Sequence, residues 1–275
     1  MKLLPIYELP LWSAFLIFIM FSFIGWVSEV IYVGVTSAHK FVNRGFLHGP
    51  LCPVYGFGGV VILMLPSSLY KTWIPLFFAS MILCTIVEYF VSWLMEKLFH
   101  TRWWDYSHYK IQLNGRICLL NSVLFGFLGV AVIHFVYPLI LNLLDLLGQF
   151  VINVTGEAIF VALMIDLSLT VYKLINFSKV MQKMKDLRET ITMHYGQEEW
   201  LKKDSFTEMI ASVKEQAELK KEAFNQKILE NLEKVQALPH HTVESFVKRF
   251  PSIKSNQYME ELNLFKERIK NRIRK

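Results

Sequence analysis

Apolar residues dominate the first 175 residues of the chain, where they form five long stretches. The stretches cover about 11–34, 54–70, 73–96, 117–141 and 151–174. A bilayer core about 30 Å thick needs about 20 helical residues at 1.5 Å each, and all five stretches are near that length. The pattern predicts an all-α fold in which residues 1–175 form a polytopic transmembrane helix bundle of about five spans.

The second stretch is the weakest of the five. It is short, it opens with three glycines, and two prolines precede it: Pro50, Pro53, Gly56, Gly58 and Gly59. Glycine and proline at these positions also suit a segment that enters the membrane and turns back. Two interpretations therefore stay open for 54–70, a full span and a re-entrant segment.

Residues 176–275 have a different pattern, with apolar residues at helical spacing among charged ones. We expect span five to continue as a helix to Gly196. Ser205 and Glu208 form a capping box for a second helix with an 11-residue apolar repeat. Shorter helices are expected near 242–250 and 258–273. Because each helix has one apolar stripe, we predict a cytoplasmic helical tail that pairs as a hairpin or as a homo-oligomeric coiled coil.

Composition supports this division. Of the 275 residues, 53% are hydrophobic and 19% are charged, which is too apolar for an average soluble domain. The net charge of +6 comes mostly from the tail, where basic and acidic residues alternate, so we expect anionic lipid beside it and no nucleic acid. Three scattered cysteines exclude a disulfide scaffold, and their spacing offers no metal site: Cys52, Cys84 and Cys118.

The distribution of lysine and arginine predicts the orientation. With five spans, every basic connection falls on one side: 36–53, 97–116 and the region after 174. Positive residues favour the cytoplasmic side. We therefore expect a multi-pass protein of the cell membrane with its amino terminus outside and its tail in the cytoplasm.

Acidic residues lie inside the predicted spans at Glu29, Glu88, Glu96 and Asp166, among others. A charge at membrane depth costs about 2.5–3.5 kcal/mol on insertion scales, so such residues are candidates for function. Glu29 and Glu88 each lie on a polar stripe at helical spacing, which should face the bundle interior. Ion pairs that only stabilise the bundle are the alternative.

We predict one polar cluster, or substrate path, at the cytoplasmic end of the bundle, in which acidic residues meet arginines from the basic connections. Its candidate residues are Glu29, Arg44, Glu88, Glu96, Arg102, Asp105, Asn114 and Arg116.

Two connections have unusual sequences. The first alternates turn and apolar residues, which favours an ordered segment held against the bundle. The second joins interfacial aromatic residues to charged ones, and aromatic residues at a span end are typical of the headgroup belt. The motif residues are Gly49, Pro50, Pro53, Tyr55 and Gly56 in the first connection, and Trp103, Trp104 and Tyr106 in the second.

Small residues also line one face of span four, at Ser122, Gly126 and Gly129. Such a strip lets another helix approach closely. His134, further along, is expected to be a packing residue, because no second histidine or cysteine stands at metal-ligand spacing.

Taken together, these motifs resemble the ABC-transporter permeases of the CmpB type, a bacterial group of small integral membrane proteins. The resemblance covers about residues 12–140. It rests on Gly25-Trp26 with Glu29, Arg44 to Leu47, Gly49 to Pro53, Tyr55-Gly56, Glu88-Tyr89, Met95 to Lys97, Arg102 to Ser107, Asn114 to Leu119 and Phe125-Gly126. Where the family pattern has Asn, this chain has Gln112. The resemblance implies transport, with no particular substrate.

Three classes of function are considered. The first is a transport subunit driven by a separate ATPase, because the chain contains no phosphate-binding loop of its own. The second is a membrane-embedded enzyme acting on a lipid headgroup, and the third is an adaptor or sensor that works through its tail. We favour transport, expect no enzymatic activity, and predict no catalytic residue, metal or cofactor.

Overall fold

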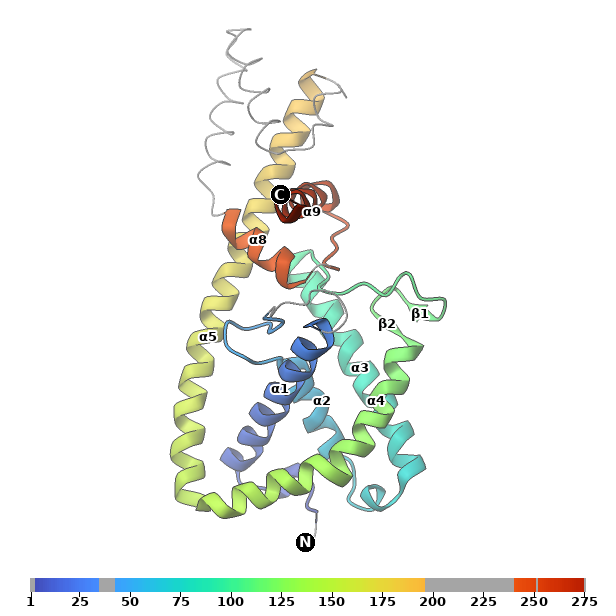
Figure 1. Cartoon of the computed structure of the whole chain (residues 1–275), viewed down its shortest axis with the longest axis vertical. Coiled ribbons are helices and arrows are strands. Elements are labelled where there is room, and N and C mark those ends of the chain that lie inside the picture. The colour runs from blue at the N-terminus through green and yellow to red at the C-terminus, as the bar shows by residue number, and fades with distance from the viewer. Residues whose placement is uncertain (1–2, 35–42, 196–239, 251, 275) are drawn as a thin grey trace. The chain divides into compact units, whose positions relative to one another are not determined.

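The computed structural model is mostly helical and describes residues 3–34, 43–195, 240–250 and 252–274 (Figure 1). Its elements, in chain order, are η1 (Ile6–Glu8), α1 (Leu11–Val33), α2 (Pro53–Leu63), η3 (Leu69–Lys71), α3 (Trp73–Phe99), β1 (Gln112–Leu113), β2 (Ile117–Cys118), α4 (Leu119–Ala131), η4 (Val132–Val136), α5 (Tyr137–Tyr195), α8 (His240–Arg249) and α9 (Met259–Arg274). The η4 turn is a π-helix, and the two strands form one antiparallel hairpin.

Three helical segments are long and apolar enough to cross a membrane. They are Leu11–Tyr32, Trp73–Phe99 and Leu119–Glu189, the last made of α4, η4 and α5 in succession. Gly148 interrupts this third segment, because its φ of 71° and ψ of 153° are not helical. The spans predicted at 117–141 and 151–174 therefore lie on either side of Gly148. The described part of the chain thus has three candidate membrane helices by length and composition.

The second predicted stretch differs from a full span. Helix α2 has 11 residues, which at 1.5 Å each reach about half the thickness of a bilayer core. Pro53 starts the helix, and Pro66, which cannot continue one, follows shortly after its end. Residues 43–52, before α2, are not helical. The Cys52 amide donates to the Ser22 carbonyl at 3.0 Å, so α2 begins opposite the middle of α1.

Glycines allow α2 to lie directly on α1. A Cβ atom on Gly56 would fall 2.2 Å from Ser22 Oγ, and one on Gly59 would fall 2.4 Å from the Phe21 ring. The predicted small-residue strip of α4 packs in the same way against α3. A Cβ atom on Gly129 would fall 2.1 Å from Ser80 Oγ. The prediction that this strip serves close helix packing is confirmed.

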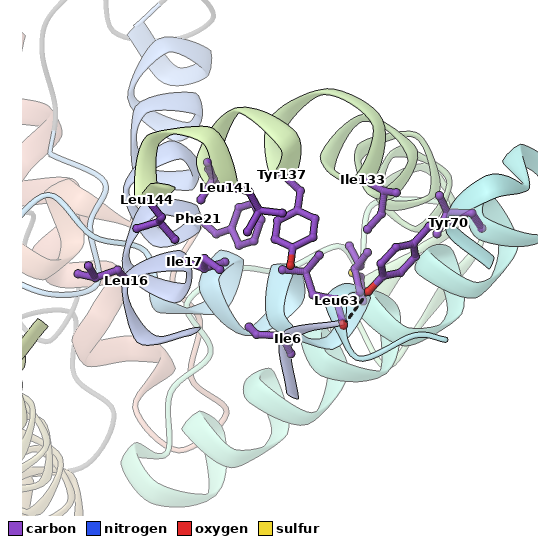
Figure 2. Close-up of a cluster of buried hydrophobic side chains, with 14 of the residues drawn as sticks. Ile6, Leu16, Ile17, Phe21, Leu63, Tyr70, Ile133, Tyr137, Leu141 and Leu144 are labelled. Atoms are coloured by element: carbon purple, nitrogen blue, oxygen red, sulfur yellow. Dashed lines mark hydrogen bonds between the residues drawn. The ribbon is translucent and has the colours of Figure 1, made fainter. Parts of the chain in front are cut away.

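An apolar core joins α1, α2, α3, η4 and the first part of α5 (Figure 2). Its tyrosines keep their hydroxyls satisfied: Tyr70 donates to the Leu63 carbonyl at 2.7 Å and Tyr137 donates to the Leu4 carbonyl at 2.6 Å. The core contacts the first half of α1, through Ile17 and Phe21. The second half of α1 is therefore left to the polar contacts described below.

Helix α3 buries a polar face and exposes an apolar one. Its buried residues recur every fourth position and include two serines and a glutamate: Leu76, Ser80, Cys84, Glu88 and Ser92. Large apolar side chains are exposed between them, at Ile74, Phe78, Ile82, Ile86 and Phe90. This is the arrangement expected when lipid, and not water, surrounds a helix bundle. Burial of Glu88 and Ser92 confirms that their stripe faces the interior.

The chain divides into two compact units. The first comprises Met1–Leu94 and Asp105–Thr170, and the second comprises Met95–Trp104 and Val171–Lys275. In the second unit, Trp103 packs against three aromatic residues: Phe177 of α5, Phe246 of α8 and Phe250, which follows α8. The helices predicted near 242–250 and 258–273 are present as α8 and α9. The capping box at Ser205 and the 11-residue repeat lie outside the described residues, so the coiled coil and self-association stay predictions.

Candidate functional site

Glu29, near the end of α1, is held by a tyrosine and an arginine. Its Oε1 accepts a hydrogen bond from the Tyr55 hydroxyl of α2 at 2.7 Å, and its Oε2 lies 3.9 Å from Arg44 Nε. Gly25, one turn earlier, makes the first contact possible, since a Cβ atom there would fall 2.3 Å from the Tyr55 ring. The acid of the predicted stripe is thus paired with Arg44.

Glu88, on the buried face of α3, has a different environment. The residue is 7% exposed, and its Oε1 accepts a hydrogen bond from the Tyr106 hydroxyl at 3.2 Å. The amide of Asn121 in α4 also lies close enough to interact with the carboxylate. Its Oε2 is buried and has no hydrogen bond of ordinary geometry within the described part of the chain.

A short hairpin positions Tyr106. The Tyr106 amide donates to the Gly115 carbonyl at 2.9 Å, and the hairpin turns at Asn114 and Gly115, whose φ angles are 54° and 68°. Asn-Gly is the dipeptide that tolerates two successive left-handed residues, so it could have predicted this hairpin. Gln112, the departure from the family pattern, accepts a hydrogen bond from the Gly115 amide at 2.6 Å.

The hairpin also carries two of the predicted site residues toward α3. Asn114 Nδ2 donates to the Tyr89 hydroxyl at 3.0 Å, and the Arg116 guanidinium carbon lies 5.5 Å from the centre of the same ring. Burial and the charge of Glu88 raise the pKa of Tyr106 well above its ordinary value. The Tyr106 hydroxyl therefore stays protonated and remains a donor to Glu88.

The two acidic residues interact with each other through space. Glu29 acts electrostatically on Glu88, and the hydroxyls of Tyr55 and Tyr106 act on one another. We call Glu29, Tyr55, Glu88 and Tyr106 the acid–tyrosine cluster. It combines residues from α1, α2, α3 and the segment before the hairpin, all within the first unit.

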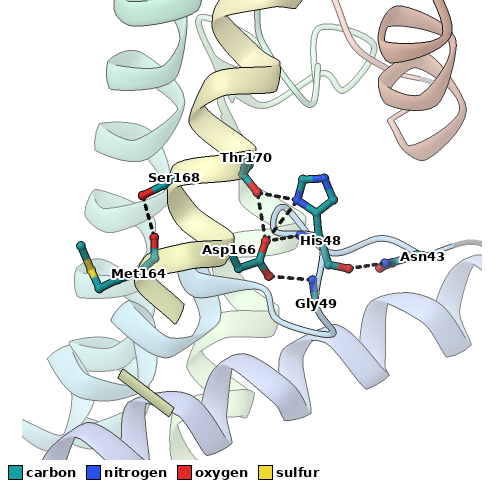
Figure 3. A network of polar contacts seen from close by, with 7 residues as sticks. All are labelled: Asn43, His48, Gly49, Met164, Asp166, Ser168 and Thr170. Carbon is teal, nitrogen blue, oxygen red and sulfur yellow. Dashed lines mark hydrogen bonds and ion pairs between the residues drawn. The ribbon is translucent and has the colours of Figure 1, made fainter. Parts of the chain in front are cut away.

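Asp166 of α5 holds the segment 43–52 in place (Figure 3). Its carboxylate accepts hydrogen bonds from the backbone amides of His48 at 2.9 Å and Gly49 at 2.7 Å. The His48 ring lies 3.1 Å from both Asp166 Oδ1 and Thr170 Oγ1, and Thr170 also donates to Asp166. The sequence identified Asp166 as an acidic residue inside a predicted span, but it did not predict the pairing of Asp166 with His48.

Asn43 folds the start of the same segment. Its Oδ1 accepts hydrogen bonds from Trp26 Nε1 at 2.8 Å and from the Gly45 amide at 2.9 Å, while its Nδ2 donates to the His48 carbonyl. The predicted ordered segment thus lies against α1 and α5, held by hydrogen bonds of Asn43, His48 and Gly49. Cys52, at the end of the segment, is 6% exposed.

Residues 16–171, more than half of the chain, match the model of the family described as "Putative ABC-transporter type IV". The chain belongs to this family. The expected resemblance is therefore confirmed, and the matched region contains the acid–tyrosine cluster and Asp166. Searches of curated proteins and of solved structures gave no match.

In this ABC-transporter-type protein, two of the remaining predicted charges, Glu96 and Arg102, belong to the second unit, whereas Asp105 belongs to the first unit with the acid–tyrosine cluster. Glu96 and Arg102 form an ion pair at 3.0 Å within the second unit, where the Arg102 backbone also pairs with Lys254. Asp105 accepts hydrogen bonds from the amide and hydroxyl of Ser107 and so shapes a local turn. The single cluster predicted from sequence, which joined all of these to Glu29 and Glu88, stays a prediction.

The interpretation of Trp103 as a headgroup-belt residue was wrong. Trp103 is 3% exposed and packs against Phe177, Phe246 and Phe250. Its neighbour Trp104 is partly buried in the same unit. The physical reason is that residues 95–104 group with the tail helices, which offer an aromatic core as an alternative to the lipid interface.

The described residues contain no group of three or more histidine, cysteine or acidic side chains that could hold a metal ion. His134 stacks on Trp73 with ring centres 4.5 Å apart, which fits the packing role expected for it. The cluster instead offers carboxylate and hydroxyl oxygens, with Arg44 beside Glu29. Such a set can bind polar or cationic groups inside the bundle.

Proposed function

We propose that the chain is the permease-like membrane subunit of a transporter and that the acid–tyrosine cluster lies on its polar path. Membership of the ABC-transporter-type family supports transport. The observation that carries the proposal is the burial of Glu88 on the polar face of a helix long enough to cross a membrane. Intramembrane acidic residues of this kind are typical of substrate and ion pathways.

The proposed topology has five crossings. In this topology the non-helical residues 43–52 and helix α2 together form the second crossing beside α1, and non-helical backbone is tolerated at membrane depth where protein covers it. The break at Gly148 separates the fourth crossing from the fifth. The excess of lysine and arginine in the connections then places the amino terminus outside and the tail in the cytoplasm.

A separate ATPase would drive the subunit, because the sequence has no phosphate-binding loop. We infer that the chain itself does no covalent chemistry. The test is purification of the full chain from native membranes into nanodiscs. We expect an ATP-hydrolysing protein to copurify, and E88Q to lower the ATPase rate of the complex while S168A, an exposed serine of α5, leaves it unchanged.

An adaptor function is the second candidate, and the packing of the second unit favours it. There the residues that follow α3 are joined to α8 through Trp103 and to the segment after α8 through the Arg102–Lys254 backbone pairing. A partner bound to the tail could act on α3 through these contacts. Copurification of a tail-bound partner without any ATPase would support the adaptor and contradict the transport subunit.

A further inference from the structure

The buried face of α3 carries polar atoms that are unsatisfied within the described part of the chain. They are Ser80 Oγ, Glu88 Oε2 and Ser92 Oγ. Ser80 is 0% exposed, Glu88 7% and Ser92 2%. Glu88 and Ser92 are one helical turn apart, about 6 Å along the axis at 1.5 Å per residue. A buried acceptor without a donor is costly, so two of them on adjacent turns indicate a bound group.

The charge at this place is also unbalanced. Glu88 takes part in no ion pair among the described residues, whereas Glu29 faces Arg44 and Glu96 faces Arg102. The groups that act on the Glu88 carboxylate are the Tyr106 hydroxyl, the Asn121 amide and the negative Glu29. A buried carboxylate in an apolar interior either takes up a proton or is neutralised by a compensating positive charge.

The oxygens present decide the class of ligand. Carboxylate, hydroxyl and amide oxygens suit hard cations, whereas the soft metals prefer sulfur and imidazole. Calcium takes six to eight oxygens, commonly from several carboxylates, and the described residues hold no group of three acidic, histidine or cysteine side chains. A site with one carboxylate and otherwise neutral oxygens has one negative charge, which a monovalent cation would neutralise. The Tyr106 hydroxyl, while donating to Glu88, keeps lone pairs for such an ion.

We propose that Glu88, Ser92 and Tyr106 bind a monovalent inorganic cation in the interior of the bundle. The ion neutralises Glu88 and joins α3 to the segment before the hairpin. The site does not rest on the proposed transport function, because a bound ion would also stabilise a bundle that transports nothing.

Thermal unfolding of the full chain in nanodiscs tests the proposal. The unfolding midpoint should rise with increasing NaCl or KCl but not with choline chloride at the same ionic strength, because only a bound ion stabilises the fold by mass action. E88Q should abolish the rise, and S92A should move it to higher salt concentration. E96Q is the matched control on the same helix, since Glu96 is paired with Arg102, and it should keep the rise.

Binding of radioactive sodium or rubidium to the native chain gives an independent measurement. We expect about one ion per chain, lost in E88Q and retained in E96Q. Equal stabilisation by choline, an unchanged salt response in E88Q, or absence of sodium and rubidium binding to the native chain would overturn the proposal. If E88Q does not fold, the binding to the native chain and its weakening in S92A decide the matter.

Discussion

Glu29 and Glu88 are acidic residues of neighbouring helices, and their partners give them different roles. Glu29 has both a tyrosine hydroxyl and Arg44 beside its carboxylate. Glu88 has Tyr106 and Asn121 but no cation among the described residues. A paired acid can be removed together with its partner at little cost, whereas an acid without a counter-charge is the better candidate for a ligand.

The Glu29–Arg44 pair should behave as a structural unit. E29Q and R44Q should each lower the free energy of unfolding by about 1–2 kcal/mol, because a hydrogen bond or ion pair to a charged group is lost. The double variant should lose less than the sum, since no lone charge stays buried. Chemical unfolding in detergent micelles measures all three. Fully additive losses would show that the two side chains do not interact.

Cys52 should react slowly with thiol reagents while the protein is folded. The residue is only 6% exposed, so a reagent can reach the sulfur only when the surrounding segment opens. Maleimide labelling followed by mass spectrometry should find Cys52 unmodified until the chain is unfolded. Fast labelling of the folded protein at pH 8 would contradict its burial.

Helices α1 and α2 depend on glycine at their contact. G56A should destabilise the fold by about 1–3 kcal/mol, because the new methyl group would meet Ser22 Oγ and the Phe18 ring. G58A is the matched control on the same helix, where a Cβ atom would meet only Cys84 Sγ, at 3.7 Å. It should be neutral or slightly stabilising through helix propensity. Equal effects of the two changes on the unfolding midpoint would refute the close packing.

Asp166 should control the order of segment 43–52. D166N replaces one acceptor oxygen with a donor that faces the amides of His48 or Gly49, so both hydrogen bonds cannot be kept. We expect faster hydrogen exchange at these two amides and a lower unfolding midpoint. S168A is the control, because Ser168 bonds only to the Met164 carbonyl of its own helix. Unchanged exchange in D166N would argue against this role.

The helices of the apolar half could be predicted because hydrophobic length and spacing are local properties. For residues 54–70 the sequence left two interpretations open, a full span and a re-entrant segment. The length of α2 could not be predicted because it depends on how the chain before Pro53 packs on α1. The hairpin at Asn114 had a local signal in its Asn-Gly pair. The pairing of His48 with Asp166, 118 residues apart, had none, because nothing in the spacing selects a partner on another helix.

At the scale of the whole molecule, the two units rest on different kinds of packing. The first buries polar and small residues of α3 and exposes apolar ones, whereas the second buries an aromatic core around Trp103. The family match ends at residue 171, next to the end of the first unit at Thr170. Sequence separated the apolar half from the tail by composition. The sequence pattern could not assign residues 95–104 to one of the two units, because a tryptophan such as Trp103 is compatible with both the lipid interface and a protein core.

The central claim is that the bundle lies in lipid with the polar face of α3 inside. Single spin-labelled cysteines along α3, from position 76 to 92 in nanodiscs, test it through their collision with lipid-dissolved oxygen. We predict maxima at Phe78, Ile82, Ile86 and Phe90 and minima at Leu76, Ser80, Cys84, Glu88 and Ser92. A pattern without this period, or with its maxima at Ser80, Glu88 and Ser92, would contradict the account.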